Sequence, residues 1–164
     1  MRAIIVTLLL LLIAPYSQAC EIQSYFSPAD NIEKVVISNL SQAKKSVHLS
    51  LYGIANRRLA EKLVELKKAG VEVTLCEDKT QAAGAHDQHT YLEENGVRVV
   101  IKKTGVLEHN KFAIIDGSVV IMGSWNWSVS AQKQDNSDMV IKDCPEEVQK
   151  FEDAFKRILE RDSK

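Results

Sequence analysis

Short apolar stretches and longer amphipathic ones follow one another along the chain. The short stretches, typical of strands, lie at 22–27, 47–52, 71–76, 97–102, 112–115, 119–122 and 137–142. The stretch 47–52 alternates strictly between apolar and polar residues, which predicts one buried face. Three helices are expected, with apolar stripes formed by Ile32, Val35, Val36, Leu40 and Ala43, by Leu59, Leu63 and Leu66, and by Val148, Phe151, Phe155 and Ile158. This order of elements predicts an α/β or α+β sheet with covering helices.

Turn and capping residues mark several boundaries of these elements. Asp30 and Asn56 each stand just before an expected helix, where their side chains can accept hydrogen bonds from the free N–H groups of its first turn. Asp116 and Gly117, between two apolar stretches, are a strong signal for a hairpin turn. Residues 77–85 are mostly polar or small, so we expect a loop there, followed by a short helix.

The N-terminal residues have the pattern of a cleaved secretory signal. A basic residue precedes an apolar run, and Ser17 and Ala19 place small side chains three and one positions before a cut at Cys20. A membrane anchor is the alternative, but the run of about 12 residues is shorter than the roughly 20 of a span. Lipid attachment at Cys20 is a second, less favoured alternative. We expect residues 1–19 to be a signal peptide and residues 20–164 to form one domain, exported to the periplasm or the medium.

The composition is that of an ordinary globular protein. The chain has 164 residues, of which 45% are apolar and 26% charged, and its formal net charge is −1. A chain of this length can bury a real core as one domain. The charge gives no overall basic field to attract a nucleic acid, so an anion-binding site would have to be local.

Three cysteines remain after the expected cut: Cys20, Cys76 and Cys144. An exported protein meets an oxidising compartment, so one disulfide with one odd thiol is plausible. Cys20 opens the mature chain and Cys144 closes the last expected strand, which makes Cys20–Cys144 the pairing we predict. Three unpaired cysteines, with Cys76 simply buried, are the equally weighted alternative.

One stretch of the sequence carries residues suited to phosphate chemistry. His109 and Lys111 are one pleat apart, so in a strand both project from the same side, about 7 Å apart. A lysine neutralises anionic oxygens, and an imidazole can attack phosphorus or transfer a proton. The apolar run 112–115 would hold the pair on rigid backbone. By the same period, Ser124 and Asn126 share a side across the hairpin and offer further donors to a phosphate oxygen.

These residues resemble the signature of the phospholipase D superfamily, H-x-K-x4-D followed by G-S-x-N. The matching residues, all at the family's spacing, are His109, Lys111, Asp116, Gly123, Ser124 and Asn126. In its size, its signal peptide and its single copy of the motif, the chain is similar to the small exported bacterial endonucleases of this superfamily. The resemblance implies one α/β domain, with a mixed sheet flanked by helices on both faces and an active site at a homodimer interface.

The resemblance also implies a mechanism that uses two histidines and neither a metal ion nor another cofactor. One motif histidine attacks the phosphodiester and forms a phosphohistidine, a second protonates the leaving oxygen, and water then hydrolyses the intermediate. This chain has one such motif, because none of its other histidines, His48, His86 and His89, begins H-x-K. The hypothesis therefore requires a homodimer in which two His109 residues face each other across a two-fold axis.

The family pattern gives each matching residue a role. His109 would be the nucleophile in one subunit and the general acid in the other. Lys111 and Asn126 would bind the non-bridging phosphate oxygens and stabilise the charge of the transition state, with Ser124 as a lesser ligand. Asp116 would lock the hairpin rather than contact the substrate.

Asp138 stands where the small nucleases carry a glutamate that hydrogen-bonds the motif histidine. A carboxylate there would fix the tautomer of His109 and support its positive form. We expect Asp138 to orient His109, although aspartate is one methylene group shorter than glutamate.

Other conspicuous residues have plainer interpretations. Trp125 and Trp127 could stack on bases or lipid, but we expect them to pack on the face opposite Asn126. His86 and His89, three residues apart, could be a metal pair. With no third ligand evident in the sequence, a polar helix start is the favoured interpretation. Lys102 and the lysine that follows it are expected to be solvated charges, with the lining of a cleft near the motif as the alternative.

The preferred function is metal-independent hydrolysis of phosphodiester bonds in DNA or RNA, outside the cytoplasm. The alternative is a phospholipase D that acts on phosphatidyl headgroups, since the two activities share their chemistry. A non-catalytic nucleic-acid- or membrane-binding module is a third hypothesis, which the intact His109, Lys111 and Asn126 argue against.

Overall fold

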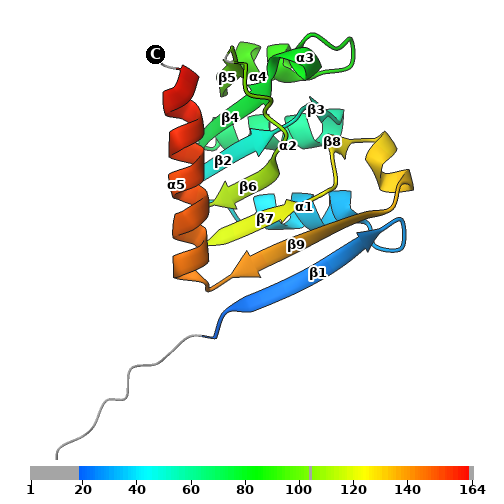
Figure 1. Ribbon diagram of the computed structural model, residues 1–164, viewed down its shortest axis with the longest axis vertical. Helices are drawn as coiled ribbons and strands as arrows, with labels where there is room; N and C mark the ends of the chain where they lie inside the picture. The colour runs from blue at the N-terminus through cyan, green and yellow to red at the C-terminus, as the bar shows by residue number, and fades with distance from the viewer. Residues whose placement is uncertain (1–18, 104, 163–164) are drawn as a thin grey trace, which may run out of the picture.

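A seven-stranded sheet forms the centre of the protein, which a computed structural model describes for residues 19–103 and 105–162 (Figure 1). The strands are ordered β1-β9-β7-β6-β2-β4-β5. Their bounds are β1 Glu21–Ser27, β2 Ser46–Leu51, β4 Glu72–Asp78, β5 Arg98–Lys102, β6 Lys111–Ile115, β7 Val119–Gly123 and β9 Asn136–Lys142. Each apolar stretch that predicted a strand forms one. The expected signal peptide, apart from Ala19, lies outside the described residues.

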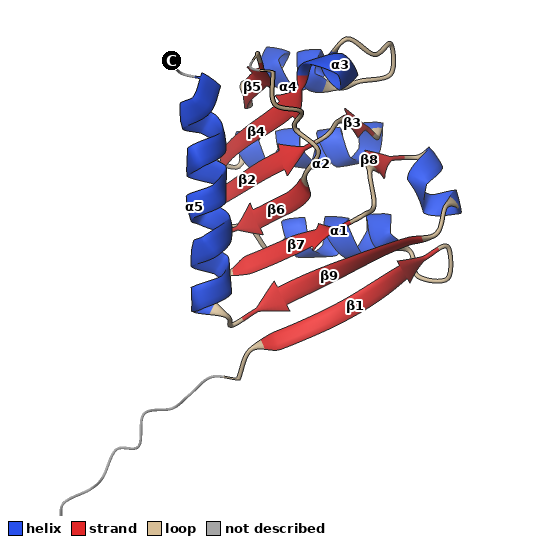
Figure 2. Ribbon diagram, in the orientation of Figure 1, coloured by secondary structure: helices blue, strands red, loops and turns tan. Residues whose placement is uncertain are grey.

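The sheet is mixed, as expected. β2, β4 and β5 are parallel to one another, while β6, β7, β9 and β1 continue from β2 in antiparallel pairs. The ends of β2, β4 and β7 and the start of β6 therefore meet at one edge (Figure 2). At that edge lies a small second sheet, in which β3 (Ile54–Ala55) pairs with β8 (Trp127–Ser128).

Helices cover both faces of the sheet. α1 (Ile32–Leu40) and α2 (Arg57–Lys68) lie on one face, and the long α5 (Pro145–Asp162) crosses the other (Figure 1). The shorter elements are α3 (Lys79–Ala82), α4 (His89–Glu94) and the 3-10 helix η1 (Ser130–Lys133). Within residues 19–103 and 105–162, no helix is long and apolar enough to cross a membrane.

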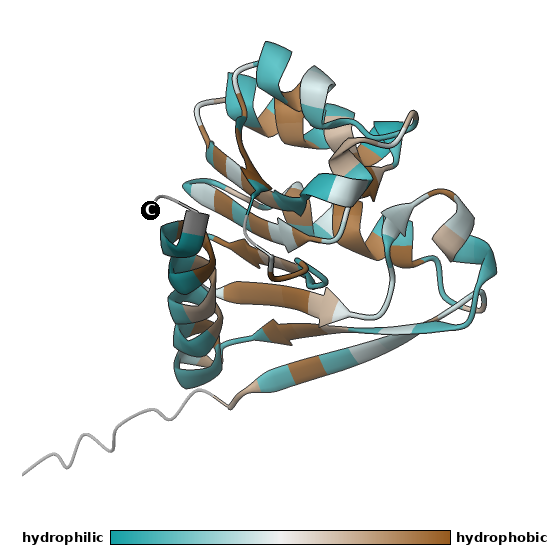
Figure 3. Ribbon diagram, turned by 45° about the horizontal axis from the view of Figure 1, so that its top comes forward, coloured by the Kyte–Doolittle hydropathy of each residue, from teal (hydrophilic) through white to brown (hydrophobic). Residues whose placement is uncertain are grey.

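Two apolar cores follow from these layers. The larger one lies between the sheet and the helices α1 and α2, and the smaller one lies under α5. α5 buries Val148, Phe155 and Ile158 and half-buries Phe151, while its outer face is hydrophilic (Figure 3). The stripe expected from the sequence is thus the packed face of this helix.

The helix caps agree with the sequence in one case and differ in the other. Asn56 caps α2, where its side chain accepts from the N–H groups of Arg58 and Leu59. α1 is capped by Asn31, which accepts from the N–H of Lys34, and not by Asp30. The carboxylate of Asp30 instead accepts from the N–H of Phe26, which closes the turn after β1.

The loop expected at 77–85 is wrong over residues 77–82. β4 continues to Asp78, and α3 follows immediately. Glu77 and Asp78 are both buried, because this end of β4 lies under neighbouring segments of the chain. Asp78 also caps α3 by accepting from the N–H of Thr80.

The predicted disulfide is present. Cys20 and Cys144 are bonded, with their Cα atoms 4.7 Å apart, and join the start of β1 to the segment before α5. Cys76 is buried in β4 and takes no part in this bond.

Lys102 was expected to be solvated, and the structure corrects this. The side chain is buried at the end of β5, and its Nζ donates to the carbonyl oxygen of Ile158 in α5 at 3.2 Å. The ammonium group can be buried here because it donates to a carbonyl oxygen near the C-terminus of α5, the negative end of the helix dipole. This helix lies more than 40 residues further along the chain, so the contact is not visible in the local sequence.

The β6–β7 hairpin is closed by Asp116 and Gly117, both in the left-handed region with φ of 53° and 62°. The Asp116 carboxylate accepts from the N–H groups of Lys44, Lys45 and Ser46 at 2.7–3.1 Å. Burial alone would raise the pKa of Asp116, but these donors outweigh it and lower the pKa. The hairpin is thus locked to the segment before β2, at the opposite end of β6 from His109.

Replacing Asp116 with alanine should lower the free energy of unfolding by about 3 kcal/mol, because three N–H groups lose a charged acceptor and the left-handed backbone loses a tolerant residue. Chemical denaturation at neutral pH measures this. Asp143→Ala is the matched control, since Asp143 has a φ of 55° but no side-chain hydrogen bond among the described residues. An equal loss in the control would show that backbone strain, not the carboxylate, explains the effect.

Candidate active site

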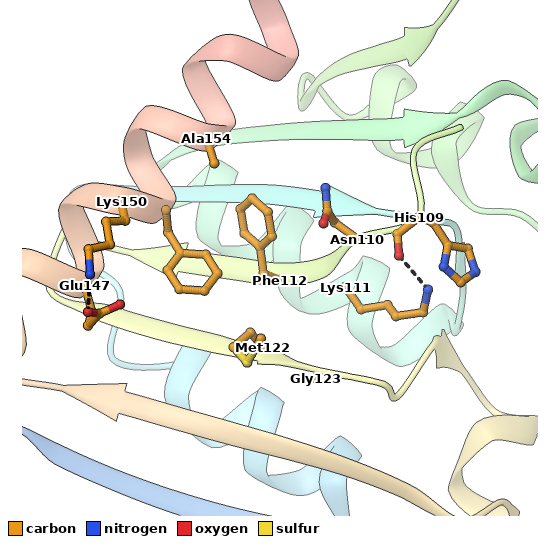
Figure 4. A pocket seen from close by; sticks show the side chains of 10 residues that line it. His109, Asn110, Lys111, Phe112, Met122, Gly123, Glu147, Lys150 and Ala154 are labelled. Atoms are coloured by element: carbon orange, nitrogen blue, oxygen red, sulfur yellow. Dashed lines mark hydrogen bonds and ion pairs between the residues drawn. The ribbon is translucent and has the colours of Figure 1, made fainter. Parts of the chain in front are cut away.

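His109 and Lys111 stand at the entrance of β6 and share one aromatic neighbour. The His109 ring meets the Tyr52 ring edge-on at a centroid distance of 4.7 Å, and Lys111 Nζ lies 5.2 Å from the centre of the Tyr52 ring. Lys111 Nζ also donates to the carbonyl oxygen of His109 at 2.8 Å (Figure 4). The predicted pair is therefore assembled, with His109 exposed and Lys111 half-buried. Burial lowers the pKa of Lys111, and the nearby Glu108 carboxylate opposes that shift.

A buried carboxylate holds the backbone on which His109 lies. Glu108 Oε1 accepts from Ser50 Oγ at 3.0 Å, from Asn110 Nδ2 at 2.6 Å and from the Asn110 N–H at 3.2 Å. The N–H of Glu108 donates to Asp78 Oδ2 at 3.0 Å. The residues that flank His109 are thus fixed to the ends of both β2 and β4.

Two cavities flank this pair of residues. The first, of about 410 Å³, is lined by His109 and Lys111 and continues over Phe112, Met122 and Phe151 toward α5 (Figure 4). It is mostly apolar beyond the two motif residues.

The second cavity, of about 330 Å³, is lined by Tyr52, Asn126, Asp87 and neighbouring residues. The pairing of β3 with β8 brings Asn126 to this place, and its Oδ1 is buried without a hydrogen-bond partner. Tyr52 thus lines one cavity with Asn126 and also contacts His109 and Lys111, and the four residues lie at one edge of the sheet.

Ser124 is exposed, and its hydroxyl is held by β9. Its Oγ accepts from the Ser137 N–H at 3.0 Å. Gly123, just before it, is a glycine because β9 lies close: a Cβ there would be 2.1 Å from Asp138 Oδ1 and 2.3 Å from the Ser137 carbonyl oxygen. Gly123 and Ser124 thus allow the end of β7 to pack closely against β9.

The expected hydrogen bond from Asp138 to His109 is absent from the described structure. Asp138 Oδ1 instead accepts from the Trp125 N–H at 2.9 Å. The shorter aspartate side chain ends at the turn after β7, which it fixes, and so it positions Ser124 and Asn126 rather than His109. Burial raises the pKa of Asp138 to about 6, although the N–H groups of Trp125 and Ser124 partly oppose this. Trp125 and Trp127 are buried in the larger core, which confirms the packing interpretation.

A family model described as "Cardiolipin synthase, PLD-like domain" matches residues 36–159, a range that includes every motif residue and most of the sheet. The chain belongs to this phospholipase D-like family.

Relatives and a solved structure agree with this family. The mitochondrial cardiolipin hydrolase of Chlamydomonas reinhardtii is 28% identical over 119 residues, which cover 73% of this chain and 53% of that protein. The phospholipase D of Rickettsia bellii is 24% identical over 121 residues, 74% of this chain and 60% of that protein. The chain thus spans little more than half the length of these relatives. The crystal structure of Nuc, a phospholipase D family member from Salmonella typhimurium, matches with a TM-score of 0.81 at 23% identity, over 87% of this chain and 95% of that chain.

Sequence reasoning missed the residues that support the phospholipase D-like motif from neighbouring strands. Tyr52, Ser50 and Asp78 come from the ends of β2 and β4, and Glu108 comes from the segment before the motif. One signal was available, since polar residues at the carboxyl ends of adjacent parallel strands meet at one edge of a sheet.

Glu108→Ala should lower the free energy of unfolding by about 2–3 kcal/mol, because the Ser50 hydroxyl and two donors of Asn110 lose their acceptor. Glu108→Gln keeps an acceptor oxygen and should lose about 1 kcal/mol or less. Urea denaturation of both variants measures the difference. Equal losses would mean that packing, and not the accepted hydrogen bonds, holds this segment.

The pH dependence of stability should differ between the protein and its Asp138→Asn variant. The folded-state pKa of Asp138, about 6, lies above its ordinary 3.8, so the folded state binds the proton more tightly. The protonated form therefore stabilises the fold at low pH, and that contribution is lost as pH rises from about 4 through 6. Relative to Asp138→Asn, the protein should lose about 2 kcal/mol between pH 4 and 7. Parallel unfolding curves over that range would contradict this.

Proposed function

We propose that this phospholipase D-like protein hydrolyses phosphodiester bonds in nucleic acid, with His109 as the nucleophile. The observation that carries the proposal is the pairing of His109 and Lys111 at the entrance of β6, where both contact Tyr52 beside an open cavity. A nucleophile and a cation held on buried backbone can meet a phosphate group in a fixed geometry.

The reaction would proceed in two displacements. The unprotonated nitrogen of His109 attacks phosphorus, the P–O bond to the leaving group breaks, and a second histidine gives that oxygen a proton. Water then attacks the phosphohistidine, losing a proton to the second histidine, and the P–N bond breaks. Lys111 and Asn126 would stabilise the charge on the non-bridging oxygens, and the exposed Ser124 would add a weaker contact.

The second histidine would come from a second copy of the chain. Apolar side chains are exposed beside the site: Val106 and Leu107, just before the motif, are 54% and 55% exposed, and Val129, shortly after Asn126, is 60% exposed. Isolated exposed apolar residues are common, but three beside one site support a partner surface there. A two-fold axis through this edge would place His109 of each subunit on opposite sides of one phosphate.

Nucleic acid is the substrate that the chain's architecture favours. The fold covers 95% of Nuc but the alignment covers only 53% of the Chlamydomonas cardiolipin hydrolase, so the chain has the dimensions of the small family members. Export to the periplasm or the medium fits this function. The Cys20–Cys144 disulfide uses the sulfur atom that a lipid would need, which supports export without a lipid anchor.

Phosphatidyl headgroups are the second candidate substrate, and one observation favours them. The cavity that begins at His109 and Lys111 continues over Phe112, Met122 and Phe151, so an apolar chain could lie beside the phosphate (Figure 4).

The test uses residues 20–164 and the variant His109→Ala in excess EDTA, each offered labelled single- and double-stranded oligonucleotides and, separately, phosphatidylcholine vesicles. We expect oligonucleotide cleavage that survives EDTA and falls by at least about 10⁴-fold in the variant, because the covalent route is lost. Rapid denaturation in detergent at alkaline pH, where the P–N bond of phosphohistidine survives, should trap a labelled phosphoryl fragment on the protein during turnover, but not on the variant.

Headgroup release with intact oligonucleotides would replace the first substrate with the second. Full cleavage by His109→Ala would contradict the nucleophile assignment, and cleavage by a protein that stays monomeric in analytical ultracentrifugation would contradict the dimer. Lys67→Ala is a control, since it removes a lysine from the last turn of α2, away from the motif.

A further inference from the structure

Glu77, Asp87 and His89 converge next to the second cavity, outside the residues assigned to phosphate chemistry. One potential ligand atom of each lies within 4.8 Å of those of the other two. Glu77 is near the end of β4, Asp87 lies between α3 and α4, and His89 is the first residue of α4. Three separate segments therefore bring a carboxyl or imidazole group to one point.

The carboxyl group of Glu77 is buried and only half satisfied. The residue is 0% exposed, its Oε1 accepts from the Ile54 N–H at 3.1 Å, and its Oε2 is buried without a hydrogen-bond donor. The same N–H lies 3.3 Å from Asp87 Oδ2, so one donor serves two carboxyl groups. Among the described residues, no lysine or arginine forms an ion pair with either group. The nearest basic group is the His89 imidazole, which contacts Asp87 but leaves Glu77 Oε2 without a donor. Two carboxyl groups this close need a proton or a cation between them.

His89 supplies a nitrogen at this point. Its Nδ1 lies 2.8 Å from Asp87 Oδ1, and its side chain is 23% exposed while that of Asp87 is 4% exposed. The Asp87 carboxylate is further fixed by the His89 N–H at 2.7 Å. A neutral imidazole nitrogen with two carboxylate oxygens suits Zn²⁺ and similar ions, whereas Mg²⁺ and Ca²⁺ prefer oxygen ligands alone.

We propose that Glu77, Asp87 and His89 bind one divalent transition-metal ion, for which Zn²⁺ is the best match. Bonds of about 2.0–2.2 Å in a tetrahedral site place the ligand atoms about 3.3 Å apart. The ion would therefore replace the 2.8 Å contact between Asp87 Oδ1 and His89 Nδ1, and water would complete the coordination from the cavity that Asp87 lines. The ion would join β4 to α4 and would fix the wall that faces Tyr52 and Asn126. Its role is structural, because none of its ligands takes part in the phosphohistidine route.

A proton is the rival of the metal ion at this point. Burial, together with the facing Asp87 carboxyl, raises the pKa of Glu77 well above its usual range. A proton shared by the two carboxyl groups would also neutralise the pair, but it would make no use of His89 as a ligand. Metal binding and its dependence on His89 therefore separate the two states.

The experiment titrates Zn²⁺ alone into the untagged, oxidised protein after removal of bound metals, using calorimetry, and follows Co²⁺ by its visible absorption. We expect one ion per chain, a raised unfolding temperature, and affinities at least about 100-fold lower in Glu77→Gln and His89→Ala. Glu77→Gln exchanges a buried carboxyl for a neutral group of the same shape, so it should fold. His86→Ala is the matched control, since His86 is exposed in the same loop and lies outside the cluster.

No binding, or equal binding by Glu77→Gln, would overturn the proposal in favour of the shared proton. Loss of binding in His86→Ala would place the ion on the surface and would also overturn it. Oligonucleotide cleavage is measured separately, below the unfolding temperature of the metal-free protein. It reports on His109, so either proposal can fail without the other.

Discussion

The candidate active site depends on one buried carboxylate, that of Glu108, the residue before the proposed nucleophile His109. Glu108 accepts from Ser50 and Asn110, and its own N–H donates to Asp78. Strand β6 therefore begins where the ends of β2 and β4 hold it. The exposed His109 thus lies between the buried Glu108 and the first residue of β6, so hydrogen bonds on both sides fix its backbone position. Without these hydrogen bonds, only the apolar residues of β6, which follow His109 in the sequence, would fix its position. The segment before His109 would be an unanchored loop.

The same use of carboxylates recurs at both ends of the hairpin. Asp116 accepts from three N–H groups before β2, and Asp138 accepts from the Trp125 N–H at the turn after β7. In both places the carboxylate accepts from backbone N–H groups at the end of a strand, where the hydrogen bonds between neighbouring strands stop. Asp116 and Asp138 thus face the backbone, whereas Glu147 and Asp87 each line one of the two cavities. The groups proposed to contact the phosphate, those of His109, Lys111 and Asn126, are neutral or cationic. A formal net charge of −1 is therefore compatible with a local site for an anion.

Local signals in the sequence predicted the seven strands of the main sheet, the long helices, the hairpin and the motif, because period, turn residues and spacing are properties of neighbouring residues. The short elements β3, β8, α3 and η1 were not predicted. The buried charges were missed for the opposite reason. Lys102 and Glu108 form hydrogen bonds with residues 56 and 58 positions away in the sequence. When such distant partners are unknown, a charged side chain is predicted to be exposed to solvent. Asp138 differs for another reason. Its carboxylate accepts from the Trp125 N–H of the turn after β7, a contact between β9 and that turn that spacing along the chain does not reveal.

The geometry of phosphoryl transfer explains why one chain would be insufficient. The attacking and leaving atoms lie roughly in line on opposite sides of phosphorus, so one imidazole cannot attack and protonate in the same step. A second His109 across a two-fold axis would stand on the leaving side, and it would bring its own Lys111 with it. The positive charge at the phosphate would then double while each chain remains slightly acidic. The exposed Val106 and Leu107 lie just before the motif, so burying them against a partner would stabilise the same contact that completes the chemistry.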